Sequence, residues 1–388
     1  MSDAVVRVGE VYVYATLRRE FTLMKTQEVI PYLLGCKLLG TEAVIEGDLV
    51  VFDVSRRNKN FKVITKNGPS YLLKEGLEQH SKRTLTNEAA VYQRLHTGNQ
   101  NNEIQQFIPR FYKFDPESNC LVLELLVEAQ DLWEYHTKSS HFSTTLASKM
   151  GAGLAALHSV QFHEAEDKNF SSDTLPWAFT LHRPKLNILR DISSANLELI
   201  KIIQRFKVLC DLLDSLRKQW RTESLIHGDI KWDNLIVYQK PGSKRKTKIK
   251  IIDWEMAGIG DPCWDVGSVF SEYLSCWILS IPVTGETPPE QFPKLAKYPL
   301  SRMQPAIRAF WRSYILRMKL DSTAAEQMLL RAVKFGAARL VQTSFEHMYT
   351  SVQLTGNIIC LLQICLNILQ RPEEAIVKLL GIPLKGME

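Results

Sequence analysis

The segment LIHGDIKWDN, residues 225–234, holds several side chains that could take part in one reaction. Asp229 could align an acceptor hydroxyl or accept its proton. Asn234 offers an amide oxygen to Mg²⁺, which prefers hard oxygen ligands, and Lys231 could bring its ammonium near a transferring phosphoryl group. Phosphoryl transfer depends mainly on charges held in such positions. We interpret the segment as a phosphoryl-transfer loop, although a polar turn before a strand could hold the same residues.

A second segment, IIDWEMAGIGDPCWDVG, covers residues 251–267. Asp253 ends an apolar strand, where its carboxylate could bridge metal-bound phosphate oxygens. Asp265 stands among glycine and apolar residues, so we expect it to be buried. A buried carboxylate needs hydrogen-bond partners, and the backbone amides of the 225–234 loop are plausible ones. We interpret Asp265 as structural rather than as a ligand.

Lys74, in the strand-like stretch SYLLKEG, is a candidate for binding nucleotide phosphates. Glu88 follows on a predicted helix at a distance that permits a Lys–Glu pair, which would aim the ammonium at the phosphates. A lysine at the end of an apolar strand is normally solvated. The two other segments favour the phosphate-binding interpretation.

The elements that must position these residues follow from alternation and helical periodicity. Up to residue 143 the pattern predicts mainly strands with two helices, and from Thr144 it predicts mainly helices around a central hairpin. This order predicts an α+β fold with a small β-rich lobe and a larger helical lobe. The predicted strands are 10–17, 48–54, 61–65, 70–76, 110–115, 120–126, 234–239 and 248–254, and the clearest predicted helices are 25–39, 81–96, 145–158 and 196–220.

Composition narrows the class of protein. The chain has 388 residues, 45% of them hydrophobic, and a net charge of +6, which is ordinary for a soluble protein. Its seven cysteines contain no CxxC pair, as expected in the reducing cytoplasm. No apolar stretch suggests a secretory signal or a membrane span, and no nucleic-acid-binding motif occurs. We expect a cytoplasmic protein without membrane or nucleic-acid partners.

Together these segments resemble the aminoglycoside phosphotransferase and choline kinase family, which is related to the protein kinases. The resemblance covers residues 48–350 and is most specific over 227–267. It implies a bilobal, protein-kinase-like fold and a kinase that uses ATP and Mg²⁺. The roles that it implies are Asp229 as the catalytic aspartate, Asn234 and Asp253 as Mg²⁺ ligands, Lys74 and Glu88 at the phosphates, and Leu125 and Val127 in the stretch 125–128 beside adenine. The catalytic role of Lys231 is predicted from its place in the loop, two residues after Asp229.

Two features depart from the patterns of related kinases: the turn after the first strand of the β-rich lobe departs from the protein kinases, and Lys231 departs from the antibiotic kinases. The turn DVSRRNKNF contains no glycine, so Ser55, with Arg56 and Arg57, could contact phosphate in place of a glycine-rich turn. Lys231 resembles the lysine in the loop of Ser/Thr protein kinases rather than the residue common in antibiotic kinases. The predicted domains are an N-terminal addition (1–47), a nucleotide-binding lobe (48–128) and a helical lobe with the catalytic loop and acceptor site (129–388).

The acceptor is left open. A small molecule such as an amino sugar or amino alcohol would require an acidic pocket, to which residues 191–198 and 346–349 could contribute. The N-terminal region more loosely resembles the stand-alone kinases of lanthipeptide (class V, thioviridamide-like) biosynthesis, which implies Ser/Thr of a precursor peptide as acceptor and a partner lyase. A peptide would require a groove, for instance near the basic hairpin 240–250. The rival class is a pseudokinase that binds nucleotide or peptide without turnover.

Overall fold

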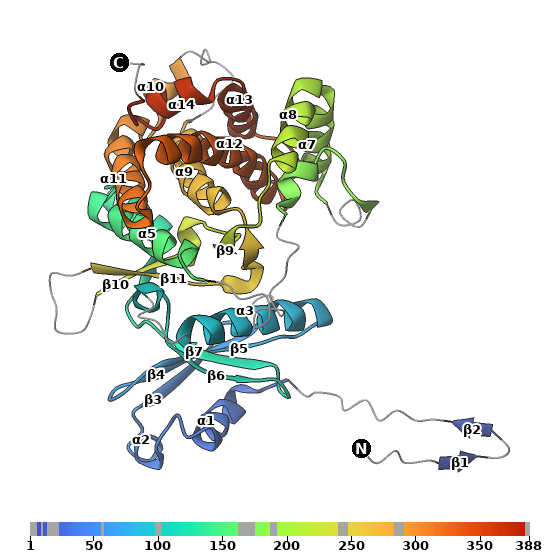
Figure 1. The fold of residues 1–388 in the computed structure, drawn as a ribbon. Helices are drawn as coiled ribbons and strands as arrows, with labels where there is room; N and C mark the ends of the chain where they lie inside the picture. The colour runs from blue at the N-terminus through green and yellow to red at the C-terminus, as the bar shows by residue number, and fades with distance from the viewer. Residues whose placement is uncertain are drawn as a thin grey trace. The chain divides into compact units, whose positions relative to one another are not determined.

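The computed structural model describes residues 6–8, 11–13, 23–55, 58–97, 103–161, 175–186, 192–239, 247–282 and 291–384. The chain divides into two compact units, residues 1–85 with 112–125 and residues 86–111 with 126–388 (Figure 1). Each unit is described separately below. The predicted domain boundaries at residues 47 and 128 stay predictions.

Unit 1 is built on a five-stranded sheet of order β3-β4-β5-β7-β6. The pairs β3–β4, β4–β5 and β5–β7 are antiparallel, as expected for strands joined by short turns. All five strands were predicted from alternation, and the prediction is confirmed. The strands are β3 (Leu49–Asp53), β4 (Lys59–Thr65), β5 (Tyr71–Glu75), β6 (Phe111–Asp115) and β7 (Cys120–Glu124), and a separate hairpin joins β1 (Val6–Val8) to β2 (Val11–Val13).

One face of this sheet is covered by α1 (Thr26–Gly35), which is followed by the short α2 (Thr41–Ile45). Val29 and Leu33 of α1 share a buried core with Phe61 of β4 and Leu73 of β5. Since side chains alternate along a strand, Lys74 points to the opposite face.

The single predicted helix 25–39 is too long, because α1 ends at Gly35 and a second helix begins six residues later.

The helix α3 (Gln79–Thr97) runs from unit 1 into unit 2, which holds the remaining helices and three short β-pairings. The bounds of these elements are η1 (Glu103–Phe107), β8 (Gln130–Asp131), α4 (Leu132–Ser139), α5 (Thr144–His158), η2 (Trp177–Thr180), α7 (Ser194–Arg205), α8 (Lys207–Lys218), β9 (Ser224–Ile226), η3 (Trp232–Asn234), β10 (Leu235–Gln239), β11 (Thr247–Ile251), η4 (Trp254–Met256), β12 (Gly258–Gly260), α9 (Pro262–Leu279), α10 (Phe292–Leu295), α11 (Leu300–Met318), α12 (Ser322–His347), α13 (Gly356–Gln370) and α14 (Pro372–Lys378). None of the described helices is both long and apolar enough to cross a membrane.

The predicted single helix 196–220 is wrong, because the structure has two helices, α7 and α8. They are separated by Phe206, whose φ of −93° and ψ of 81° are not helical. The apolar positions keep their spacing across this break, with Leu199 and Ile203 buried before it and Leu209 and Leu213 buried after it. Periodicity alone could not reveal a one-residue interruption.

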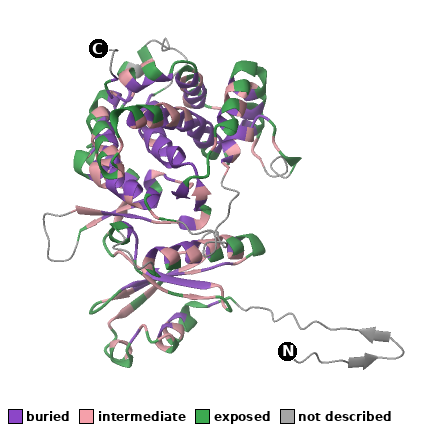
Figure 2. Ribbon diagram, in the orientation of Figure 1, coloured by how far each residue is buried: buried purple, intermediate pink, exposed green. Residues whose placement is uncertain are grey.

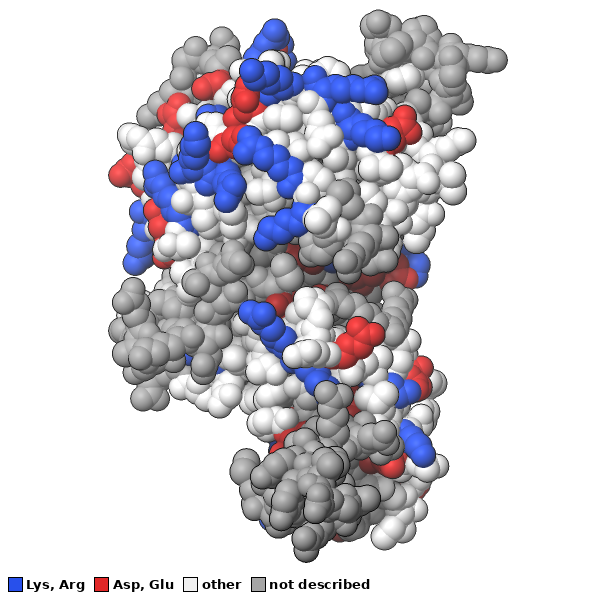
Figure 3. All heavy atoms as spheres, turned by 90° about the vertical axis from the view of Figure 1, so that its right-hand side faces the viewer, with Lys and Arg blue, Asp and Glu red and all other residues white. Residues whose placement is uncertain are grey.

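The outer sides of α7 and α8 are basic, with exposed residues that include Lys201, Arg205, Lys207, Arg217 and Lys218. Figure 3 shows Lys and Arg side chains, with fewer Asp and Glu, on the face of unit 2 that is turned to the viewer. These residues account for part of the net charge of +6.

The helix α9 is the centre of the core of unit 2, and nearly all of its residues are buried (Figure 2). It crosses α12 at a pair of glycines, Gly267 and Gly336. A Cβ on Gly267 would lie 2.4 Å from the Ala332 carbonyl oxygen and 2.6 Å from the Gly336 nitrogen. The two backbones can touch only because neither position carries a side chain.

Replacing Gly267 with Ala is therefore expected to destabilise unit 2 by about 1–3 kcal/mol, the usual cost of overpacking a core. All eight tryptophans of the chain lie in unit 2, so tryptophan fluorescence during urea unfolding measures this unit. The control is Ser268→Ala on the same helix. The buried Ser268 hydroxyl has no hydrogen-bond partner among the described residues, so its removal should leave stability unchanged or higher. Equal stability of the wild type and the Gly267 variant would show that the helices can separate at no cost.

Candidate active site

The loop that connects β9 to β10, residues 227–234, is held by the buried carboxylate of Asp265 on α9. The amides of His227 and Gly228 donate hydrogen bonds to its two oxygens, at 2.7 and 3.0 Å. His158 Nε2 lies 3.2 Å from the same carboxylate, whose side chain is 0% exposed. These contacts confirm the prediction that Asp265 is a structural residue with the loop amides as partners.

The same loop is locked to the segment that follows β11. His227 is fully buried, and its Nε2 lies 2.9 Å from the carbonyl oxygen of Ile252. Gly228 has a φ of +79°, and a Cβ there would lie 2.6 Å from the Met256 carbonyl oxygen. Both the left-handed backbone and the close approach require glycine at this position. The loop and the segment 252–256 are therefore packed directly against each other.

Asp229 is held from both sides by cations. Lys231 Nζ lies 2.8 Å from its Oδ2, and Arg339 Nη2 lies 3.4 Å from its Oδ1. Asn234 Nδ2 donates to the Asp229 backbone oxygen at 2.9 Å and is 3.3 Å from its Oδ2. Burial by itself raises the pKa of the Asp229 carboxyl, but the charges of Arg339 and Lys231 more than offset it, so this pKa lies below its ordinary value. Asp229 is thus ionised at neutral pH and oriented.

Asn234 and Asp253 lie at adjoining ends of the hairpin β10–β11. The Ile252 amide donates to the Asn234 carbonyl oxygen at 3.0 Å, next to the paired residues Leu235 and Ile251. Asp253 has φ 67° and ψ 63°, a left-handed conformation that costs a non-glycine residue about 1–2 kcal/mol. Such an outlier is often found at a functional site.

This pair fits the predicted Mg²⁺ site in its chemistry. The Asn234 amide nitrogen is engaged by Asp229, which leaves the amide oxygen for another ligand, and a carboxylate and an amide oxygen are hard donors. Within the described residues, no group of three or more His, Cys, Asp or Glu could hold a metal ion. A metal at this place would depend on Asn234, Asp253 and the oxygens of a bound phosphate. The ligand roles stay predictions.

Residues of α3 reach the same segment. The Asn87 side-chain amide donates to the carbonyl oxygens of Glu255 and Ala257 at 3.2 and 2.9 Å, and the ring of Tyr92 lies 6.4 Å from that of Trp254. The neighbour of Asn87 is Glu88, which is 2% exposed. Sequence reasoning did not name Asn87, which fixes this part of α3 beside Asp253.

The other residues predicted to bind nucleotide lie mostly in unit 1. Lys74 is the fourth residue of β5, inside the strand and not at its end, and it pairs with Asn60 and Leu121. Lys74 and Glu88 belong to different units, so their ion pair stays a prediction. Leu125 and Val127 follow directly after β7, and Val127 is 43% exposed.

Ser55 shapes the turn after β3. Its hydroxyl donates to Asp53 Oδ1 at 2.5 Å and accepts the Asn60 amide at 3.1 Å. Hydrogen bonds from Lys59 and Ser55 hold the pKa of the Asp53 carboxyl at about 2. A phosphate contact would have to compete with these bonds. Arg56 and Arg57 lie outside the described residues.

A pocket of about 600 Å³ opens beside the loop in unit 2. It lies next to Asp229, because Lys231 and Arg339 belong both to its wall and to the partners of that carboxylate. Trp133, at 39% exposure, gives it an aromatic surface, and its ring lies 5.9 Å from that of Trp232. The residues that line the pocket are Trp133, Lys231, Asp233, Glu272, Ser275, Leu279, Arg339, Thr343, Glu346 and His347.

Carboxylates dominate the charge of this pocket. Burial raises the pKa of Glu272 to about 7, although Arg339 and the Trp232 amide lower it; that amide donates to Glu272 at 2.7 Å. Desolvation and then the neighbouring Asp131 raise the pKa of Asp233. A positive charge bound beside Glu272 and Asp233 would lower these raised pKa values, so the pocket favours a positively charged ligand. Glu346 is one of the residues that the sequence nominated for an acidic acceptor pocket.

Several pocket residues were not predicted. Asp233 lies within the HGDIKWDN motif, but roles in that motif were predicted only for Asp229, Lys231 and Asn234. Glu272 and Arg339 occur in apolar helical stretches, and a charged residue at a buried helical position is the signal that could have identified them. The residues 187–191 and the basic hairpin residues 240–246, both considered for acceptor recognition, lie outside the described residues.

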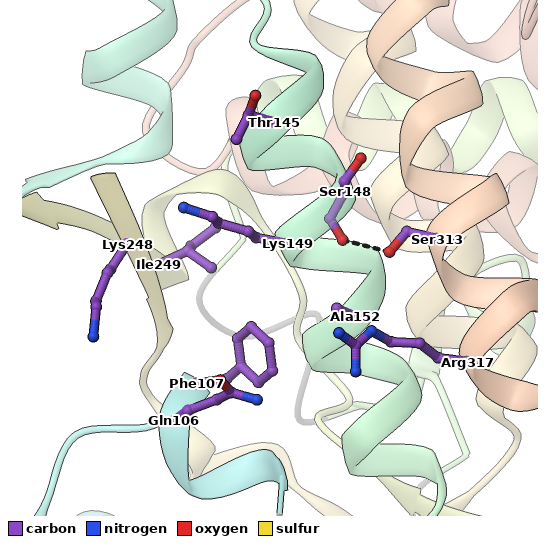
Figure 4. Close-up of a pocket in the computed structure, with 10 residues that line it drawn as sticks. All are labelled: Gln106, Phe107, Thr145, Ser148, Lys149, Ala152, Lys248, Ile249, Ser313 and Arg317. Atoms are coloured by element: carbon purple, nitrogen blue, oxygen red, sulfur yellow. Dashed lines mark hydrogen bonds between the residues drawn. The ribbon is translucent and has the colours of Figure 1, made fainter. Parts of the chain in front are cut away.

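A second pocket of unit 2, about 540 Å³, has the opposite charge. Figure 4 shows it between α5, α11 and β11, with the hydrogen bond from the Ser313 hydroxyl to the Ser148 backbone oxygen along one side. Lys149 already donates to the Thr247 carbonyl oxygen, and Arg317 donates to Glu103 at 2.7 Å. Lys248 and Ile249 belong to the basic hairpin 240–250 that was considered for a peptide acceptor, and none of the other lining residues was predicted as a site residue. The residues that line the pocket are Gln106, Phe107, Thr145, Ser148, Lys149, Ala152, Lys248, Ile249, Ser313 and Arg317.

An α+β fold with this loop, hairpin and charged pocket is that of a kinase-like phosphotransferase. Comparison with known proteins agrees: the Phosphotransferase enzyme family matches residues 48–286, more than half of the chain, and the chain belongs to this family. Members of the family are phosphotransferases that act on hydroxyl groups. The predicted resemblance and the kinase-like fold class are confirmed.

Individual relatives are distant. The 4-hydroxytryptamine kinase of Psilocybe cyanescens is 21% identical over 174 residues, which span 43% of this chain and 46% of that protein. A spectinomycin phosphotransferase solved with ADP and spectinomycin is 13% identical, with 91% of this chain and 100% of that chain covered and a TM-score of 0.47. The choline kinase LicA from Streptococcus pneumoniae is 15% identical, with 89% and 99% covered and a TM-score of 0.43.

Proposed function

We propose that this protein is a Mg-ATP-dependent kinase that transfers the γ-phosphoryl group to a hydroxyl group of a small, amine-bearing molecule. The observation that carries the proposal is the carboxylate-rich pocket that opens beside Asp229. Its volume of about 600 Å³ lies within the range of small-molecule sites. The pocket favours a small acceptor over the precursor peptide with its partner lyase.

In this mechanism Asp229 accepts a hydrogen bond from the acceptor hydroxyl and directs its oxygen at the γ-phosphorus. Because its pKa is lowered by Arg339 and Lys231 after the opposing effect of burial, Asp229 is a weak base. Its main contribution is therefore alignment, and it takes the proton late, as the bond to phosphorus forms. The ammonium of Lys231 stabilises negative charge on the transferring group.

The nucleotide is bound by the residues that the family resemblance implies. Lys74, supported by Glu88, binds the phosphates, and the stretch Leu125–Val127 contacts adenine, with Ser55 near the phosphates. Asn234 and Asp253 would hold Mg²⁺. When bound, the metal neutralises charge on the phosphate oxygens.

The acceptor amine is recognised by Asp233, Glu272 and Glu346, and a flat or apolar part of the acceptor lies on Trp133. Of the two cations of the pocket wall, Lys231 is paired with Asp229 and Arg339 with both Asp229 and Glu346. The carboxylates Asp229, Asp233, Glu272 and Glu346 outnumber these two cations, so an attraction for an amine is left. An ammonium beside an aromatic face gains a further cation–π contribution.

The test is phosphate transfer from labelled ATP to a panel of hydroxylated amines, each compared with the neutral analogue that lacks the amine. Asp233→Asn should raise the KM for the amine acceptor about tenfold, because one charged contact is lost. The KM for the neutral analogue should change little, and this comparison is the matched control. Equal changes for both acceptors, or transfer to a peptide but to no small amine, would contradict the proposal.

A further inference from the structure

The helix α12 carries a fully buried arginine between the acceptor pocket and Asp229. The Arg339 side chain is 1% exposed, and it is one of the largest fully buried side chains described. Its Nη2 lies 3.4 Å from Asp229 Oδ1, and its Nη1 lies 3.1 Å from Glu346 Oε2. One planar guanidinium therefore contacts a carboxylate of the reaction loop and a carboxylate of the pocket.

This arginine stays charged in its buried position. Burial lowers the pKa of its guanidinium, but Glu346, Asp229 and Glu272 more than offset burial and raise it. A buried guanidinium costs free energy unless carboxylates compensate it. The Nε of Arg339 is itself buried without a hydrogen-bond partner among the described residues. The positive charge of Arg339 is thus compensated by the carboxylates of Glu346 and Asp229, which contact its two terminal nitrogens.

Among the described residues, the hydrogen bonds to the Glu346 carboxylate come from α12 itself. Gln342 Nε2 donates to Glu346 Oε1 at 2.9 Å, while Arg339 holds the other oxygen of the same carboxylate. Residues 339, 342 and 346 are spaced by three and four, so they share one side of the helix. Glu346, with 40% of its side chain exposed, presents an oriented carboxylate to the pocket.

From this geometry we propose that Arg339 is a positioning residue that joins acceptor recognition to the orientation of Asp229. The inference rests on the proposed function, and it adds a specific coupling. Asp229, Arg339 and Glu346 act as one hydrogen-bonded unit, so a change at Glu346 in the pocket alters the alignment of Asp229 as well as acceptor binding. Residues that act as a unit show non-additive effects when they are replaced together.

The test compares Arg339→Lys, Glu346→Gln and the double variant by steady-state kinetics with an amine acceptor. Lysine keeps the charge, but its single ammonium cannot contact both carboxylates as the two terminal nitrogens of arginine do. Each single variant should lower kcat about ten- to a hundredfold, on the scale of a lost hydrogen bond between charged groups, and raise the acceptor KM. The KM for ATP should stay within about twofold. The kcat of the double variant should be no lower than that of Arg339→Lys alone.

Arg331→Lys is the matched control, because Arg331 lies on the same helix and is 19% exposed in its ion pair with Asp261. Its replacement should lower the melting temperature comparably to Arg339→Lys and leave kcat and both KM values unchanged. An Arg339 variant that behaves like the Arg331 variant, or additive effects in the double variant, would overturn the coupling.

Two further outcomes are also decisive. If Arg339→Lys fails to fold, Glu346→Gln decides alone: a fall in kcat supports the coupling, and a change confined to the acceptor KM overturns it. A wild-type protein that transfers no phosphoryl group overturns the proposed function and this inference together. That result is distinct from an active wild type with an unaffected Arg339 variant, which overturns only the inference.

Discussion

Asp229→Asn is expected to bind nucleotide with unchanged affinity and to transfer the phosphoryl group about 10²–10⁴ times more slowly than wild type, the scale of a positioned acid–base group. The amide keeps the size of the carboxylate and removes its charge. It can accept at one oxygen only, so Lys231 and Arg339 can no longer hold both sides of the group as they do at 2.8 and 3.4 Å. The acceptor hydroxyl then loses its oriented partner.

Calorimetry with a nucleotide and transfer from labelled ATP separate the two effects. Loss of nucleotide binding would make Asp229 a structural residue. Transfer at the wild-type rate would show that the assigned catalytic role is wrong, and nucleotide binding without transfer in the wild type as well would favour a pseudokinase.

The second large effect is expected on stability, from Asp265→Ala. The variant leaves the amides of His227 and Gly228 and the ring of His158 without the acceptor that they share at 2.7, 3.0 and 3.2 Å. Removing one partner from a buried charged contact of this kind destabilises a protein by about 3–5 kcal/mol. We expect the free energy of unfolding of unit 2 to fall by that amount, measured by tryptophan fluorescence in urea, and transfer to fall with it because the loop loses its anchor.

Asp321→Ala serves as the control for a lost aspartate contact. Asp321 caps α12 by accepting the Ala324 amide at 2.9 Å, and the loss of such a cap costs about 1 kcal/mol. Equal destabilisation by the two variants would mean that the contacts of Asp265 contribute no more than an ordinary helix cap and do not anchor the loop.

The sequence by itself determined the features that depend on neighbours along the chain. Alternation predicted the five strands of unit 1, and the loop around Asp229 and Asn234 was identified because its residues lie within six positions of one another. The contact between Asp265 and the loop amides was predicted across 37 to 38 positions, because a buried carboxylate must find donors and few candidates were available.

Only the tertiary structure decided how distant residues meet. Arg339 contacts Asp229 across 110 positions, and the pocket combines Trp133 of α4, Glu272 of α9 and Glu346 of α12. These contacts depend on how closely the helices pack, for instance where α9 and α12 cross at their two glycines. No local sequence pattern specifies which residues of two packed helices lie opposite each other. The break at Phe206 was missed for a related reason. The spacing of apolar residues shows which face of a helix is buried, but it does not show whether the helix continues, because tertiary packing decides that.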